Sequence, residues 1–213
     1  MSSASPFFLD QLLFIVLPYM AFGVFLLVSI RRYVRESFTF SSLSSQFLEN
    51  QQHFWGLVPF HYGIITVVTG HVVGFLIPRE VLAWNSQPLR LYLLEISAFI
   101  AALLTLVGLV SVIVRRLTVP KIKMVTSIAD WILFGIFVVQ ILTGVYTAVF
   151  PSWGSSWFAA SAAPYRWSLL LLNSDISFIT AMPWMVKSHT LCAYVMIAVF
   201  PFTRLLHALV VPN

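Results

Sequence analysis

Residues 59–75 read PFHYGIITVVTGHVVGF, and residues 187–210 read KSHTLCAYVMIAVFPFTRLLHALV. Each stretch belongs to an apolar run that is long enough to cross a membrane as a helix, yet each carries two histidines. An ionisable side chain inside a membrane span is costly, so it usually faces the interior of the protein and serves a function. These two stretches therefore predict both the fold and the functional site.

The composition of the whole chain is that of an integral membrane protein. Of its 213 residues, 60% are hydrophobic and 9% are charged, whereas soluble domains are about 25% charged. The basic residues form short clusters between apolar runs, so membrane topology explains them better than nucleic-acid binding. A single cysteine, Cys192, cannot build a disulfide framework, an iron–sulfur cluster or a zinc cluster within the chain. We therefore expect any metal to be held by histidine.

Five apolar runs come close to the ~20 residues that a helix needs to span the hydrocarbon core. Each run must be helical, because lipid offers no hydrogen-bond partner to an exposed backbone. The predicted fold is an all-α bundle of five transmembrane helices that forms a single membrane domain over residues 1–213. The predicted spans are residues 12–30, 54–77, 91–114, 131–150 and 182–211.

The basic residues that flank the spans predict the orientation of the bundle. One side carries Arg31, Arg32, Arg35, Arg115, Arg116, Lys121, Lys123 and Arg204. The other side carries Arg79, Arg90, Arg166 and Lys187. The richer side is expected to be cytoplasmic, which places the N-terminus outside and the C-terminus in the cytoplasm. The connection over residues 151–181 then lies outside, and its aromatic side chains are expected at the membrane interface.

Four of the five histidines fall at two levels of this bundle. The second and fifth spans run in opposite directions, so His61 and His207 lie toward the cytoplasm and His71 and His189 toward the outside. At about 1.5 Å per residue, the two levels are about 21 Å apart, which leaves room for two macrocycles. Glu95 is the only acidic residue well inside a predicted span. Paired imidazoles without carboxylates favour bis-histidine haem over a zinc or di-iron site.

The segments FHYGIITVVTGHVVGF and FPFTRLLH resemble the gamma subunit of respiratory nitrate reductase, and the resemblance runs from the first span to the end of the chain. It implies a di-haem cytochrome b of the prokaryotic cytoplasmic (inner) membrane that oxidises quinol near the outer face. His71 and His189 would hold the distal haem, and His61 and His207 the proximal haem. Electrons would pass to an iron–sulfur beta subunit and a molybdenum alpha subunit in the cytoplasm, where nitrate is reduced.

The resemblance also implies a quinol site beside the distal haem. Arg90 stands where the family has a basic residue before the third span, and Gly70 adjoins His71. The Arg90 guanidinium is expected to donate a hydrogen bond to a quinone oxygen, with ordinary snorkelling to the membrane surface as the alternative. From its position alone, Glu95 is a candidate acceptor for a quinol proton. Arg204 either pairs with a propionate of the proximal haem or marks the cytoplasmic side.

Three alternatives remain open from the sequence. The same type of cytochrome serves nitrite oxidation in reverse, or sulfur or heterodisulfide metabolism, because the terminal substrate binds to another chain. A haem-free proton or solute transporter is a more distant alternative, and it predicts carboxylate partners and interrupted helices. A passive anchor would not need four histidines. Only six residues follow His207, so docking of partners is expected on residues 31–52 and 115–129.

Overall fold

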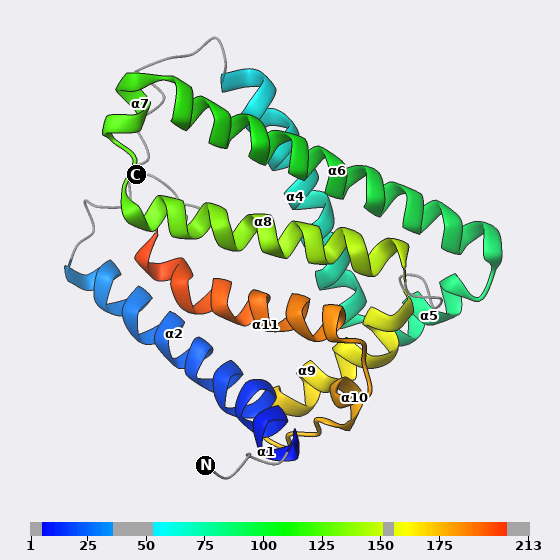
Figure 1. Cartoon of the computed structure of the whole chain (residues 1–213). Coiled ribbons are helices and arrows are strands. Elements are labelled where there is room, and N and C mark those ends of the chain that lie inside the picture. Colours follow the sequence, from blue (N-terminus) through cyan, green and yellow to red (C-terminus); the bar gives the residue numbers. More distant parts are fainter. Residues whose placement is uncertain (1–5, 36–52, 151–155, 204–213) are drawn as a thin grey trace.

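The computed structural model describes residues 6–35, 53–150 and 156–203, which are helices joined by short connections (Figure 1). Five of these helices are long and apolar enough to cross a membrane. They cover Phe8–Arg35, Gly56–Leu76, Pro88–Thr118, Ile128–Val149 and Trp184–Phe202. The predicted all-α fold with five spans is therefore confirmed, whereas the orientation of the bundle in the membrane stays a prediction.

The first and last spans are built from more than one helical element. The elements are α1 (Pro6–Gln11), the π-helical η1 (Leu12–Val16), α2 (Leu17–Arg35), α4 (His53–Leu76), α5 (Pro78–Asn85), α6 (Pro88–Thr118), α7 (Pro120–Met124), α8 (Ile128–Val149), the π-helical η3 (Phe158–Ala162), α9 (Ala163–Leu170), α10 (Ser177–Thr180), α11 (Trp184–Val199) and the 3-10 helix η4 (Phe200–Phe202). Helices α5, α6 and α7 each begin at a proline, whose missing N–H is not needed in the first turn.

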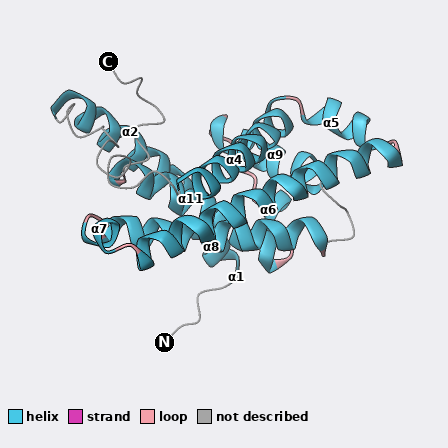
Figure 2. Ribbon diagram, turned by 90° about the horizontal axis from the view of Figure 1, so that it is seen from above, coloured by secondary structure: helices cyan, strands magenta, loops and turns pink. Residues whose placement is uncertain are grey.

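The long helices alternate in direction, so the bundle has two distinct ends (Figure 1). One end carries α5, η3, α9 and α10, and we call it the α5 end. The opposite end carries α7, and we call it the α7 end. In the perpendicular view, α6 and α8 run beside one another between these two ends (Figure 2). His71 lies near the last turns of α4 at the α5 end, and His61 lies two to three turns earlier, toward the α7 end.

Small residues allow α4 and α6 to approach each other closely. Gly63 of α4 lies against Ala101 and Thr105 of α6, and Gly108 of α6 lies against Gly56 of α4. A Cβ atom on Gly108 would sit 2.7 Å from the carbonyl oxygen of Gly56, so only glycine fits there. Membrane helices pack through small residues because apolar side chains gain little by leaving lipid. These contacts assign Gly63 a role in helix packing.

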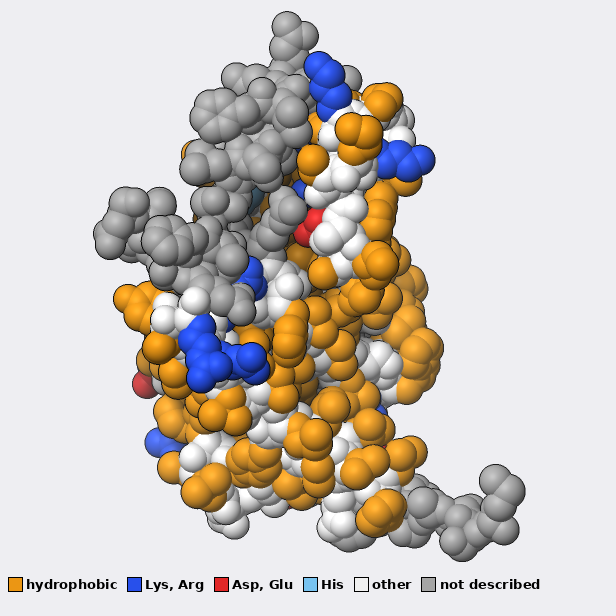
Figure 3. All heavy atoms as spheres, turned by 90° about the vertical axis from the view of Figure 1, so that its left-hand side faces the viewer, with side chains coloured by type: hydrophobic (Ala, Val, Ile, Leu, Met, Phe, Trp, Pro, Cys, Tyr) orange, Lys and Arg blue, Asp and Glu red, His pale blue; other side chains and the backbone are white. Residues whose placement is uncertain are grey.

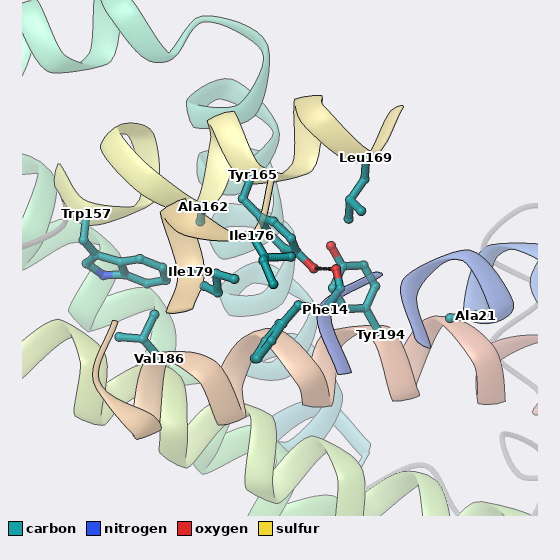
Figure 4. Packing of buried hydrophobic residues seen from close by; sticks show 10 residues of the cluster. All are labelled: Phe14, Ala21, Trp157, Ala162, Tyr165, Leu169, Ile176, Ile179, Val186 and Tyr194. Carbon is teal, nitrogen blue, oxygen red and sulfur yellow. Dashed lines mark hydrogen bonds between the residues drawn. The ribbon is translucent and has the colours of Figure 1, made fainter. Parts of the chain in front are cut away.

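The described part of the connection over residues 151–181, namely residues 156–181, folds back over the α5 end and contributes to the core (Figure 4). Trp157 is 6% exposed and Tyr165 is fully buried, so these two side chains belong to the protein core, whereas Trp167 is 37% exposed. The Tyr165 hydroxyl donates a 2.6 Å hydrogen bond to the carbonyl oxygen of Phe14, which ties α9 to the first span. Burial raises the pKa of Tyr165 far above its usual value, so the phenol remains a neutral donor.

The last span is interrupted near its end. Helix α11 ends at Val199, a 3-10 turn follows, and Thr203 is extended. Pro201 has no N–H to continue the helix. The guanidinium of Arg32 in α2 donates hydrogen bonds to the carbonyl oxygens of Pro201 and Thr203, at 2.8 Å and 3.0 Å, so the released carbonyls are satisfied.

The prediction of a continuous helix over residues 182–211 is therefore wrong. The α-helix begins at Trp184 and ends at Val199, so the rise of 1.5 Å per residue cannot be applied from His189 to His207. Both His207 and Arg204 lie outside the described residues.

A capping box and an ion pair hold the start of α8 at the α7 end. The side chain of Ser127 accepts a hydrogen bond from the Asp130 amide at 3.2 Å, and the Asp130 carboxylate accepts one from the Ser127 amide at 2.9 Å. Arg116 of α6 lies 3.8 Å from the same carboxylate. Asp130 is 5% exposed, so its charge relies on these partners.

Replacing Asp130 with alanine is expected to destabilise the protein by about 2 kcal/mol, because one cap is lost and Arg116 loses its ion pair with this carboxylate. Thermal denaturation of purified protein, followed by circular dichroism, measures the effect. Ser127→Ala is the matched variant: it removes one hydrogen bond of the cap and should cost only about 1 kcal/mol. Equal melting temperatures for D130A and the unaltered protein would contradict this account of the α8 start.

Candidate functional site

Two of the predicted ligands, His71 and His189, come together at the α5 end. They belong to α4 and α11, and their ring centres are 6.3 Å apart with a 38° angle between the ring planes. His189 is 8% exposed, and His71 is half-buried. Two imidazoles from antiparallel helices thus share one level of the bundle, as the opposite directions of the two spans predicted.

The separation of the two rings fits axial ligation of a single haem iron. Metal–nitrogen bonds are about 2 Å long, so two imidazoles on opposite sides of one metal have centres about 6 Å apart. In the part of the chain that the structure describes, no three His, Cys, Asp or Glu side chains gather as a metal-binding group. A haem needs only two protein ligands, because its macrocycle supplies the other four. The residues present therefore fit this group.

Both histidines of α4 are oriented by a backbone carbonyl one turn earlier. The Nδ1 atom of His71 lies 2.8 Å from the Val67 oxygen, and that of His61 lies 2.8 Å from the Leu57 oxygen. A carbonyl can only accept, so Nδ1 carries the proton and Nε2 keeps its lone pair. Ligating histidines are held in this way, with the second nitrogen hydrogen-bonded.

His61 is exposed on the flank of α4, with its ring edge against Phe60. Its predicted partner, His207, lies outside the described residues. The pairing of His61 with His207 therefore stays a prediction.

His189 is oriented by α8, through residues that the sequence analysis did not identify. Its Nδ1 lies 3.1 Å from both the Gln140 carbonyl oxygen and the Thr143 hydroxyl, so Nδ1 is the protonated nitrogen. Its Nε2 lies 3.2 Å from the Gln140 side-chain amide, at the position where a metal would bind. The Gln140 Oε1 atom is buried without a hydrogen-bond partner. The Gln140 side chain is thus only loosely satisfied and can yield this position to a ligand.

Three glycines lie near His71 and His189, and their surroundings differ. A Cβ on Gly144 of α8 would lie 3.0 Å from the His189 ring, so glycine lets that ring rest against α8. A Cβ on Gly74 would lie 2.9 Å from the Phe158 ring. A Cβ on Gly70 would meet nothing within 4 Å. Gly70 is exposed on the flank of α4 next to His71, so no protein atom occupies this position.

An aromatic ring and an arginine complete the described surroundings of His71. The Phe158 ring of η3 contacts His71 edge-on, with centres 4.8 Å apart. The guanidinium of Arg166 in α9 lies over the same Phe158 ring, with Cζ 5.0 Å from the ring centre. In the sequence, Arg166 stands out only as one of the basic residues that predict the orientation of the bundle. Gln140 carried a usable signal, because a polar amide inside an apolar span is costly.

The predicted quinol residues lie at the same end of the bundle. The guanidinium of Arg90, near the start of α6, lies 4.8 Å from the ring centre of Trp84 in α5. Arg90 is exposed, and Glu95 is half-buried farther along α6. The contact with Trp84 is compatible with quinol binding and with snorkelling, so both roles stay open.

Comparison with known proteins identifies the family of this chain. Residues 10–213 match the family described as "Nitrate reductase gamma subunit". The chain is 31% identical over 206 residues to the "Nitrate reductase gamma chain" of Bacillus subtilis (strain 168), a match that covers 95% of this chain and 92% of the relative. It is 27% identical over 210 residues to the "Respiratory nitrate reductase 1 gamma chain" of Escherichia coli (strain K12), with 96% and 92% covered. With its five apolar helices, the chain belongs to the nitrate reductase gamma subunit family, a membrane subunit of respiratory nitrate reductase.

Proposed function

We propose that this chain is a di-haem cytochrome b that oxidises quinol near the outer face of the prokaryotic inner membrane. Its electrons go to an iron–sulfur beta subunit and a molybdenum alpha subunit on the cytoplasmic side. The observation that carries the proposal is the 6.3 Å separation of the His71 and His189 rings. The gamma-chain relatives support the assignment of these partners.

The chain holds the two haems through four imidazoles, His71 with His189 and His61 with His207. When bound, the haems supply one-electron redox chemistry at two depths in the membrane. The protein contributes the axial nitrogens and fixes their orientation. The carbonyls of Val67 and Gln140 bind the Nδ1 protons of the outer pair, which also makes each Nε2 a more basic ligand.

The quinol site is assigned to the space beside His71. Quinol oxidation releases two electrons and two protons, so the site needs a contact for the oxygen and a route for protons. Arg90 donates a hydrogen bond to a quinone oxygen, and Glu95 accepts a proton and releases it outward. Gly70 leaves the required space, because nothing lies within 4 Å of its Cβ position.

The α7 end is assigned to the partner subunits. Basic side chains gather in separate groups on the face seen in Figure 3. Arg31 and Arg35 at the end of α2 are exposed, as are Lys121 and Lys123 of α7. By contrast, Arg32 binds the carbonyls that follow α11. Exposed cations suit both an acidic protein surface and anionic lipid.

A dithionite-reduced minus oxidised absorbance spectrum of the purified chain tests the cytochrome assignment. We expect the signal of b-type haem, with two haems per chain and partial reduction by an added quinol. A preparation made without chelators or cofactor-stripping steps that shows no haem signal would overturn the proposal. Purification of the intact complex then tests the partners: nitrate should reoxidise its haems, whereas a partner from sulfur metabolism would not give this result.

A further inference from the structure

We propose that Arg166 is the counter-charge of the haem held by His71 and His189. Its guanidinium pairs with a carboxylate arm of that haem and stabilises the reduced iron. This inference rests on the proposed function, and it concerns a residue that the chain places in α9 rather than on either ligand-bearing helix.

The position of Arg166 is defined by its contact with an aromatic ring at the α5 end. Its Cζ lies 5.0 Å from the Phe158 ring centre, and that ring lies 4.8 Å from the centre of the His71 ring. Phe158 packs closely against Gly74 of α4. An added Cβ on Gly74 would lie only 2.9 Å from the Phe158 ring. Arg166 is therefore one aromatic ring away from His71.

Part of the Arg166 guanidinium is buried without a protein acceptor. Its Nη1 atom has no hydrogen-bond partner among the residues described. Within the same ranges, the ion pairs involve other residues, namely Arg116 with Asp130 and Lys187 with Asp10. A buried guanidinium nitrogen is costly unless an acceptor satisfies it. Apart from the nearby Tyr194 hydroxyl, the described residues place no side-chain acceptor at the guanidinium, so the position of Arg166 suits an anionic acceptor from outside this part of the chain.

A second donor points to the same acceptor. Tyr194 of α11 lies beside Arg166, and its hydroxyl is also buried without a hydrogen bond of good geometry. The neighbouring Tyr165 hydroxyl is already committed to the Phe14 carbonyl. A guanidinium and a phenol that converge suit a carboxylate, which accepts several hydrogen bonds. A haem carries such carboxylates permanently, whereas a quinol is neutral, so we assign the haem carboxylate to this position.

The charge of Arg166 has a redox consequence. Reduction of the haem that His71 and His189 would hold would add one electron while both imidazoles keep their Nδ1 protons, so the negative charge of the site would increase by one. A fixed cation nearby stabilises that state, and charge and hydrogen bonding around a haem set its potential. Arg166 therefore raises the midpoint potential of the outer haem and favours electron transfer from quinol into it.

Potentiometric titration of the two haems in the intact complex tests the inference. Arg166→Gln is expected to change the reduction equilibrium of one haem by roughly tenfold, a decrease of about 59 mV for a one-electron couple. The affected haem should be the one that is lost when His189 is replaced, and the other should keep its potential. Arg166→Lys should stay close to the unaltered protein. Arg79→Gln, which removes an exposed arginine of α5 at the same end, should change neither haem.

The outcomes separate this inference from the proposed function. Absence of haem from the unaltered protein would remove the proposed function itself. Two haems with unchanged potentials in R166Q would overturn only the role of Arg166, and so would an equal decrease in R166Q and R166K, because charge would not be responsible. If R166Q loses the outer haem, retention of that haem by R166K supports the inference, and its loss from both variants overturns it.

Discussion

Replacing His189 with alanine is expected to remove one of two haems and to reduce quinol-dependent nitrate reduction by more than about 100-fold, since even loss of a group that orients a ligand costs 10- to 100-fold. His189 is 8% exposed, and its ring is held by Gln140 and Thr143. Alanine offers no nitrogen at this position, and no third His, Cys, Asp or Glu joins the pair among the residues described. The haem content per chain, measured after extraction, should fall from two to one.

Two variants make this test specific. His71→Ala should remove the same haem, because both rings belong to one pair. Cys192→Ser is the matched control: it lies on α11 near His189, and its thiol contacts the Ile136 carbonyl oxygen at 3.5 Å. The serine variant should keep both haems and its quinol oxidation. If H189A instead retained two haems with unaltered spectra, the assignment of His189 as a ligand would be wrong.

Replacing Gly108 with valine is expected to prevent stable packing of α4 against α6. The first added carbon would lie 2.7 Å from the Gly56 carbonyl oxygen and 2.7 Å from the Phe60 Cα, which are backbone atoms that cannot rotate away. Overpacking usually costs about 1–3 kcal/mol, and a clash with backbone belongs at or above the upper end of this range. We expect little monodisperse protein on size-exclusion chromatography and a markedly lower melting temperature.

The same substitution at Gly135 is the control for this prediction. Gly135 lies in α8, another membrane-spanning helix, and a Cβ there would meet nothing within 4 Å. Gly135→Val should therefore stay within roughly 0.5 kcal/mol of the unaltered protein. Comparable behaviour of the valine variants at both positions would show that close packing of α4 on α6 is not required.

The sequence was sufficient to predict the spans, and it also anticipated the outer histidine pair. Spans can be predicted because hydrocarbon leaves the backbone no alternative to internal hydrogen bonds. His71 and His189 could be paired because their spans run in opposite directions, which requires only a count of spans. The same reasoning was less reliable at the end of the last span, where hydropathy continues past Pro201 but the helix does not.

The sequence by itself thus determined that this chain is a five-helix membrane protein in which His71 and His189 meet, because both properties follow from local composition and chain direction. Only the tertiary structure decided which groups orient those histidines and which stand beside them. Gln140, Phe158 and Arg166 come from three different elements, and they approach His71 and His189 only when α8, η3 and α9 pack around α4 and α11. Contacts between segments distant in sequence depend on this packing, and no periodicity in the chain specifies them.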